Sequence, residues 1–252
     1  MTSFGRQFGL NAATYDNVRP GYPDELFDML ADILPTGATV LEIGAGTGIA
    51  TRELLGRGLR VLAVEPDDEM ARQLSRQTVG DLEVVITDFE SYRGARRSFD
   101  AVVSAQAWHW FAGAYALRCV KRLLRHDGIF AAWWNIGTVT DDRLGRELAA
   151  VFQETNHRLP VLFRRPDLNE TIDELGRLLH EDLGFSRVEP LRYLSSVQYE
   201  PWKFVALMST MSEVLVLESD DRERVLGRLS DRLGDQVLEV EYMTLGHLAF
   251  RC

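Results

Sequence analysis

Long apolar runs, cysteines and secretory features are scarce in this sequence of 252 residues. No stretch approaches the roughly 18 consecutive apolar residues that a membrane-spanning helix needs. The first residues, MTSFGRQFGLN, lack the charged, apolar and small-residue regions of a signal peptide. The two cysteines, Cys119 and Cys252, are too few for a disulfide framework or a cysteine metal site. We therefore expect a globular, cytoplasmic protein that does not bind membranes.

Positive charge is also in short supply, because the formal net charge is −10. Binding to nucleic acids or anionic membranes favours clustered Lys and Arg. The one such cluster, RGARR at residues 93–97, is short and lies between two predicted strands. The five histidines lack the paired spacing of a metal-binding helix. The sequence therefore predicts no nucleic-acid partner and no metal, in a monomer or a homodimer.

Strand and helix patterns alternate through residues 37–135. Short aliphatic runs such as GATVLEI, RGLRVLAVE and SFDAVVSA are separated by amphipathic stretches of helical length. Nearly continuous apolar strands in such an alternation indicate a parallel sheet covered on both faces. With two more strand patterns near the C-terminus, the sequence predicts a Rossmann-like, doubly wound α/β fold with seven strands.

Three further segments surround this core. Residues 1–36 contain a predicted helix that begins near Pro23 and carries acidic residues in its first turn. Residues 136–190 interrupt the alternation with helical patterns, so we expect a helical insertion that covers a site. Residues 191–252 are predicted to add closing strands and helices to the same core.

The segment VLEIGAGTGIA carries the strongest functional signal. Gly44, Gly46 and Gly48 follow a predicted strand and precede a helix, where missing Cβ atoms let a ligand approach the backbone. Glu65 ends the second strand, where a carboxylate can reach ribose hydroxyls. A dinucleotide-binding loop needs Gly or Ala at position 49, which is Ile49, so a nicotinamide oxidoreductase is disfavoured. A tight turn without a ligand is the alternative.

The pattern E-I-G-A-G-T-G resembles the binding loop of class I S-adenosylmethionine-dependent methyltransferases. The resemblance implies S-adenosylmethionine as the cofactor, with an acid after the third strand accepting a hydrogen bond from the adenine amino group. The alternative for that acid is a helix cap or an ordinary loop residue. The cofactor-binding residues expected in this way are Glu42, Gly44, Ala45, Gly46, Gly48, Glu65, Pro66, Asp88, Phe89, Ser104 and Arg19.

A narrower resemblance rests on ATYDNVRPGYP, residues 13–23, and SAQAWHWF, residues 104–111. Both are similar to the branch that contains trans-aconitate methyltransferase-like, small-molecule enzymes. In that branch the N-terminal segment packs over the cofactor as part of a lid, which implies a catalytic role for Tyr15 and a substrate-binding role for Tyr22. Arg19 is expected to hold a carboxylate of the cofactor or the substrate.

Methyl transfer is an in-line displacement that depends mostly on alignment and on exclusion of water. Ligands of open α/β sheets bind at the carboxyl ends of the strands. Trp108 and Trp110 follow the fourth strand, so we expect their indoles to line a substrate pocket. Trp133 and Trp134 face opposite ways on the fifth strand, so at most one lines it, and Trp134 is assigned to the pocket.

His109 is the candidate general base, because imidazole titrates near neutral pH and many acceptors lose a proton. A structural hydrogen bond to a loop carbonyl is the alternative, and a carboxylate acceptor would need no base. The sequence thus predicts a methyltransferase for a small molecule, with an aromatic or heteroaromatic acceptor methylated at O, N or electron-rich C. Carboxyl methylation of a small organic acid, and a cofactor-binding protein without catalysis, remain the alternatives.

Overall fold

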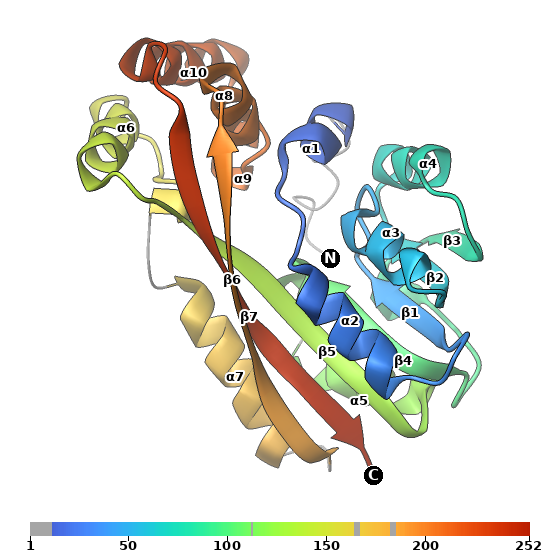
Figure 1. The fold of residues 1–252 in the computed structure, drawn as a ribbon. Helices are drawn as coiled ribbons and strands as arrows, with labels where there is room; N and C mark the ends of the chain where they lie inside the picture. Colours follow the sequence, from blue (N-terminus) through green and yellow to red (C-terminus); the bar gives the residue numbers. More distant parts are fainter. Residues whose placement is uncertain (1–11, 112, 164–166, 182–184) are drawn as a thin grey trace.

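The computed structural model describes residues 12–111, 113–163, 167–181 and 185–252. Its seven strands form a single sheet in the order β3-β2-β1-β4-β5-β7-β6, which confirms the predicted α/β fold (Figure 1). β7 runs antiparallel to both of its neighbours, whereas β1 to β5 pair in parallel. The strands are β1 (Thr39–Ile43), β2 (Arg60–Glu65), β3 (Leu82–Ile86), β4 (Phe99–Ala105), β5 (Leu124–Val139), β6 (Phe185–Tyr199) and β7 (Leu238–Arg251).

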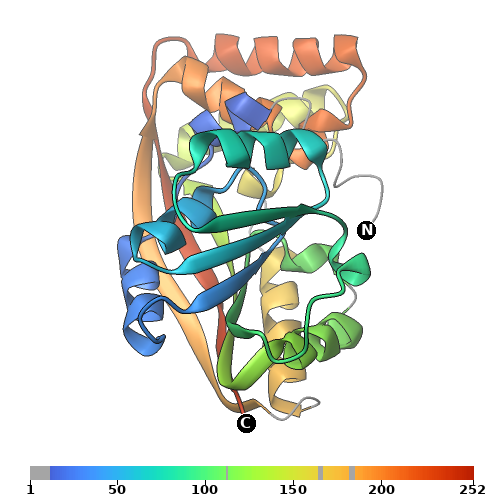
Figure 2. The same cartoon turned by 90° about the vertical axis from the view of Figure 1, so that its right-hand side faces the viewer.

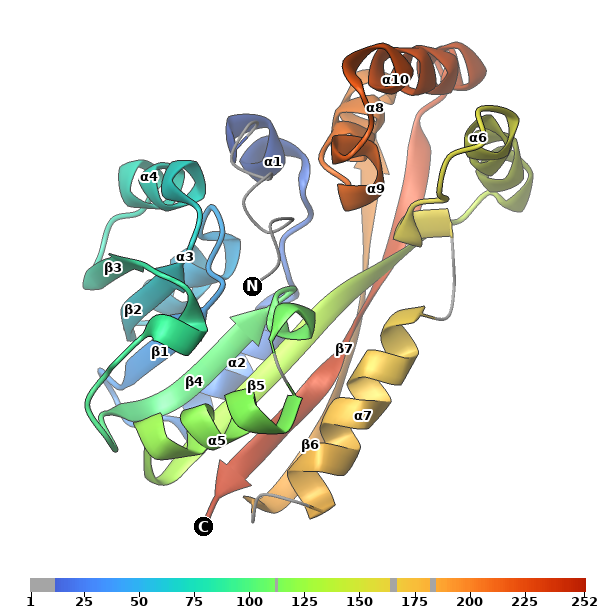
Figure 3. The ribbon, with the colours of Figure 1, turned by 180° about the vertical axis from the view of Figure 1, so that it is seen from behind.

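Helices cover both faces of the sheet. α2 (Asp24–Ile33) and α3 (Ile49–Gly56) lie on the face seen in Figure 1, and α5 (Gly113–Leu123) and α7 (Asp167–Glu181) lie on the other face, seen in Figure 3. Each face buries its own apolar cluster, with Trp133 in one and Trp134 in the other, as strand alternation requires. No helix in the described ranges is long and apolar enough to cross a membrane.

A helical cap stands at the carboxyl ends of β5 and β6. It consists of α6 (Asp142–Glu154), α8 (Pro201–Ser209), α9 (Ser212–Leu215) and α10 (Ser219–Leu233), which share a third apolar cluster with the ends of the long strands. The cap therefore combines helices from the predicted insertion and from the closing segment, while α7 of the insertion packs on the sheet.

The N-terminal segment bridges the core and the cap. α1 (Ala12–Val18) lies between α4 (Asp68–Gln77) and the cap helices in Figures 1 and 2, and Val18 belongs to the apolar cluster of the cap. The chain then passes through residues 19–23 into α2 on the sheet. This path takes the predicted lid residues across the carboxyl ends of the strands.

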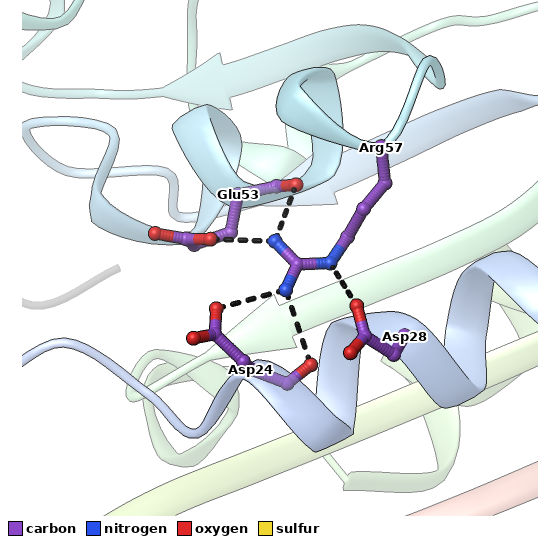
Figure 4. Close-up of polar contacts among 4 residues, drawn as sticks. All are labelled: Asp24, Asp28, Glu53 and Arg57. Atoms are coloured by element: carbon purple, nitrogen blue, oxygen red, sulfur yellow. Dashed lines mark hydrogen bonds and ion pairs between the residues drawn. The ribbon is translucent and has the colours of Figure 1, made fainter.

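One arginine ties α2 to α3. Arg57 contacts Asp24 through Nη2 at 2.8 Å, Asp28 through Nε at 2.9 Å and Glu53 through Nη1 at 2.6 Å (Figure 4). The carboxylate of Asp24 is 79% exposed, so each pair stabilises the fold by at most about 1 kcal/mol. Their combined effect is to fix the orientation of α2 relative to the helix that follows the glycine loop.

Candidate active site

Glycine is needed for a different physical reason at each of the three glycine positions in the loop after β1. Gly44 has φ +71°, and a Cβ there would lie 2.4 Å from the Cβ of Ala107. A Cβ on Gly48, at φ +88°, would lie 2.3 Å from Leu74 Cδ1. A Cβ on Gly46, at φ +58°, would meet nothing within 4 Å. Two of the glycines are therefore required by packing, and the backbone at Gly46 borders open space that a ligand can approach.

Two buried carboxylates flank this loop. Glu42 is 1% exposed and accepts a 2.5 Å hydrogen bond from Thr51 Oγ1. Glu65 is 6% exposed and accepts from the backbone amides of Gly46, at 2.8 Å, and Asp67, at 3.0 Å. Burial raises the pKa of each carboxyl group to about 7. The amide of Gly46 in the glycine loop is thus held by the acid at the end of β2.

A pocket lies against the glycine loop and beneath the N-terminal segment. Among its walls, Thr47 Oγ1 is buried and has no hydrogen-bond partner among the described residues. A buried hydroxyl without a partner is costly, so this oxygen suits a ligand with a matching polar group. The lining residues of this loop pocket are Tyr15, Tyr22, Glu42, Gly44, Ala45, Gly46, Thr47, Ile49, Ala50, Ala105 and Gln106.

A second pocket adjoins the first, between the sheet and the cap. It shares Tyr15, Tyr22, Ile49 and Gln106 with the loop pocket. Arg19 is the one charged residue among its lining residues. The lining residues of this cap pocket are Tyr15, Arg19, Pro20, Tyr22, Ile49, Gln106, Asn135, Gly137, Leu162, Leu207, Met211 and Tyr242.

Arg19 is fixed to the cap. Its Nε donates to Thr210 Oγ1 at 3.0 Å and its Nη2 to the Thr210 carbonyl at 2.7 Å, while the guanidinium lies 4.7 Å from the ring centroid of Tyr15. Arg19, expected among the cofactor residues, thus lines the cap pocket and not the loop pocket. Burial raises the pKa of Tyr22 and of Tyr242 well above the usual value, so both hydroxyls are neutral at physiological pH.

Gln106 is a wall of both pockets that the sequence analysis missed. It has a positive φ of 59°, which is uncommon for a residue other than glycine, and its Nε2 donates to the Asn135 carbonyl at 3.1 Å. The Asn135 side chain in turn donates to the Gly21 carbonyl at 2.8 Å and accepts from Thr244 at 2.6 Å. The signal in the sequence that could have identified Gln106 is its position directly after β4.

Asp88, the expected adenine acid, and Pro66, another expected cofactor residue, follow the ends of the neighbouring strands β3 and β2. Asp88 begins the short helix η3 (Phe89–Ser91) and is half-buried. Its carboxylate is close enough to Glu65 to contribute to the raised pKa of that acid. Pro66 is half-buried beside Glu65. Neither residue lines the loop pocket.

Phe89 and Ser104, two other expected cofactor residues, have structural contacts instead. Phe89 is 3% exposed and packs against Phe111 with ring centroids 5.6 Å apart. Ser104 is fully buried, and its hydroxyl donates to the Ile43 carbonyl at 3.0 Å, which joins β4 to β1. Both side chains are used within the core, and neither lines the loop pocket or the cap pocket.

The expected tryptophan walls also lie elsewhere. The short helix η4 (Trp108–Trp110) turns Trp108 back into the core, where it is 4% exposed and packs against Phe130 at a centroid distance of 4.7 Å. Trp134 is fully buried in the same cluster. Trp110 is half-buried beside His109. None of the three indoles lines the loop pocket or the cap pocket, and those of Trp108 and Trp134 fill the core behind β4 and β5 instead.

His109 accepts a hydrogen bond from Trp134 Nε1 at its Nδ1, at 3.1 Å. Burial of the imidazole ring lowers the pKa of His109 to about 4. His109 lines neither pocket, so its arrangement gives no support to a general base. The hydrogen bond is structural, although its partner is an indole and not the expected loop carbonyl.

Comparisons with known proteins agree with this geometry. A family model described as a methyltransferase domain matches residues 41–132. An uncharacterized methyltransferase of Mycobacterium tuberculosis is 41% identical over 147 residues, which are 57% of this chain and 58% of the relative. An uncharacterized methyltransferase of Schizosaccharomyces pombe is 27% identical over 236 residues, which are 90% of this chain and 87% of that protein. The match thus spans little more than half the length of the mycobacterial relative.

Two solved structures share the fold. A candidate type II methyltransferase from Anaeromyxobacter dehalogenans has a TM-score of 0.63 and 24% identity, with 92% of this chain and 97% of that chain covered. Phosphoethanolamine N-methyltransferase 2 of Haemonchus contortus, in complex with phosphomonomethylethanolamine and S-adenosylhomocysteine, has a TM-score of 0.53 and 16% identity, covering 100% of this chain and 60% of that one. The family match and the relatives support a methyltransferase; the lid and cap residues lie outside residues 41–132.

Proposed function

We propose that this chain is an S-adenosylmethionine-dependent methyltransferase that acts on a small molecule. The observation that carries the proposal is the common wall of Tyr15, Tyr22, Ile49 and Gln106 between the loop pocket and the cap pocket. Transfer of a methyl group requires a donor and an acceptor in line and shielded from water. Two adjoining pockets, one beside the glycine loop and one beneath the cap, provide that arrangement.

The loop pocket suits the cofactor. S-Adenosylmethionine supplies a methyl group on a positively charged sulfonium. The open backbone at Gly46, the unpartnered hydroxyl of Thr47 and the carboxyl of Glu42 would hold its aminoacyl part. Glu65 uses one lone pair on each oxygen for a backbone amide, and the remaining lone pairs would accept from ribose hydroxyls. We assign Pro66 and Asp88 to the adenine side by their place after β2 and β3.

The cap pocket favours an acidic acceptor. Arg19 is the one charged residue among its lining residues, which include no Asp, Glu or His. An amine or phenol acceptor would find no base there to take its proton, whereas a carboxylate is already ionised and attracts a guanidinium. We therefore favour carboxyl methylation of a small organic acid over the aromatic acceptor, because none of the expected indole walls lines the cap pocket. The apolar part of such an acid would pack against Leu162, Leu207 and Met211.

The proposed reaction needs little from the protein beyond positioning. A carboxylate oxygen of the acceptor attacks the methyl carbon while the carbon–sulfur bond breaks, giving a methyl ester and a neutral thioether. Arg19 would hold the acceptor, and Tyr15 and Tyr22, which line both pockets at their junction, would exclude water and orient both ligands. Tyr15 is therefore proposed as an aligning residue and not as an acid or base.

Isothermal titration with S-adenosylmethionine tests the first part. The wild type is expected to bind with a Kd in the micromolar range, and Glu65→Ala to weaken binding by roughly tenfold or more, because the acceptor for the ribose hydroxyls is lost. Glu69→Ala is the matched control, since its carboxylate is 46% exposed and pairs with Arg72. No binding by the wild type, or equal binding by Glu65→Ala, would contradict the proposal.

A metabolite extract incubated with a methyl-labelled donor tests the acceptor. A methyl ester releases labelled methanol under mild base, whereas N-, C- and aryl O-methyl products do not. We expect base-labile label, and roughly a ten- to hundredfold loss of kcat/KM in Arg19→Gln, because a charge-assisted contact is removed. Base-stable label would favour the aromatic acceptor, and cofactor binding without transfer to any acceptor would favour the protein without catalysis.

A further inference from the structure

One arginine joins the glycine loop to the N-terminal helix. Arg52, on α3, donates from Nη1 to the Thr47 carbonyl at 2.9 Å and from Nη2 to Asp16 Oδ1 at 2.8 Å. The side chain of Asp16 is 7% exposed and that of Arg52 is 31% exposed. The ion pair is thus partly withdrawn from water, where losing one partner costs more than at an open surface.

The N-terminal segment of α1 and Arg19 is also anchored to the cap. Arg19 binds the hydroxyl and carbonyl of Thr210, so Asp16 and Arg19 tie α1 and the residue after it to opposite sides of the site. Tyr15 precedes Asp16 in the chain and lines both pockets. The position of Tyr15 at the junction therefore depends on these two anchors.

We propose that Asp16 and Arg52 are positioning residues that hold α1 over the loop pocket and couple its closure to cofactor binding. The proposal rests on the proposed function. The residue whose carbonyl Arg52 holds, Thr47, also places an unpartnered hydroxyl on the loop pocket. A ligand that orders Thr47 would also order the guanidinium, and the guanidinium holds Asp16. By thermodynamic linkage, whatever stabilises the closed segment must also tighten the ligand.

The chemistry of arginine suits this task. A planar guanidinium can bind two acceptors at once in fixed directions, whereas a lysine ammonium on a flexible stem lacks that fork. Arg52→Lys therefore keeps the charge and should lose the simultaneous contact with Thr47 and Asp16. Asp16→Asn keeps the shape and removes the charge. The two variants test the same link from opposite sides.

The experiment uses S-adenosylhomocysteine as the probe, with hydrogen exchange of residues 12–22 and titration calorimetry as readouts. In the wild type, the probe should slow amide exchange in α1. Asp16→Asn and Arg52→Lys should each raise the Kd by about tenfold and reduce this slowing, because a partly buried charged hydrogen bond is lost. Arg143→Ala, which breaks an exposed 2.8 Å pair with Glu147 on α6, is the matched control and should change neither readout.

A variant that carries both substitutions tests whether Asp16 and Arg52 affect probe binding as a coupled pair or independently. If the two residues act as one unit, Asp16→Asn combined with Arg52→Lys should bind the probe no more weakly than the weaker single variant. Two outcomes would overturn this proposal and leave the proposed function intact. In the first, the wild type binds the probe but amide exchange in α1 does not change. In the second, both single variants bind the probe as tightly as the wild type does. Failure of the wild type to bind the probe would overturn both.

Discussion

The loop after β1 and the turn after β4 follow neighbouring parallel strands, yet they serve opposite purposes. The glycine loop, residues 44–48, leaves open space at Gly46, whereas the aromatic turn, residues 106–111, folds Trp108 back into the core. The two meet where Ala107 packs on Gly44. A glycine pattern constrains where the backbone lies, whereas a cluster of large aromatic residues indicates only that much apolar area must be buried.

Removing the core contact of the aromatic turn should have the largest effect on stability. Trp108→Ala is expected to lower the free energy of unfolding by about 4 kcal/mol, because a buried indole leaves a cavity. Urea denaturation measures this loss. Trp110→Ala, at a half-buried position, is the control with a smaller loss. If Trp108→Ala left stability unchanged and only weakened acceptor binding, the pocket-wall hypothesis would be restored.

Gly44→Ala should have the next largest effect, about 3 kcal/mol, because its Cβ would overlap Ala107 and the backbone is left-handed. Gly46→Ala is the matched control: it carries only the left-handed strain of about 1 kcal/mol, and its methyl group enters the space beside the loop pocket. We therefore expect Gly46→Ala to lose more cofactor affinity than stability, measured by calorimetry and urea denaturation. Equal stability losses at the two glycines would contradict the distinction.

The buried acid Glu42, beside the glycine loop, should make stability depend on pH. Because burial raises the folded-state pKa of Glu42 to about 7, protonation favours the folded state, and wild-type stability should fall as the pH rises from about 4.5 through 7. Glu42→Gln should remove about half of this dependence, because Glu65 with its similarly raised pKa remains, and should be on the order of 2 kcal/mol more stable than the wild type at pH 8. Glu69→Gln, at an exposed position, should leave the pH profile unchanged. If stability depended on pH in the same way in Glu42→Gln as in the wild type, Glu42 would not be the titrating group.

His109→Ala should have the smallest effect, about 1 kcal/mol, because it leaves the Trp134 N–H without its acceptor. Cofactor affinity and turnover should be unchanged. Since the pKa of His109 is lowered in the folded state, its contribution should be present above about pH 6.5 and decline as the pH falls. A large loss of turnover at unchanged stability would restore the general-base hypothesis.

Local sequence patterns were sufficient to predict many strands of the core but not how distant strands pair. The predicted ends of the first two strands, Ile43 and Glu65, agree with the structure. β5 continues past Asn135 to Val139, and the reversed direction of β7 depends on pairing between distant segments, which periodicity cannot report.

In the candidate site, too, contiguous residues could be predicted from the sequence and contacts between distant residues could not. The loop around Gly46 was identifiable because its residues are contiguous and glycine has a specific backbone role. The contact of Arg19 with Thr210 joins residues 191 positions apart, so no local motif could predict it. Gln106 carries a left-handed backbone without glycine, and only the fold reveals that strain.

The length of the last three strands has a mechanical consequence. β5, β6 and β7 contain 16, 15 and 14 residues and run without interruption from the core into the cap, about 50 Å at the usual rise per residue. A pivot of the cap would have to bend a continuous ladder that extends from Ile129 paired with Phe250 to Val139 paired with Val240. The cap is therefore a stiff extension of the sheet, and the residue after α1 is joined to it through the contacts of Arg19 with Thr210.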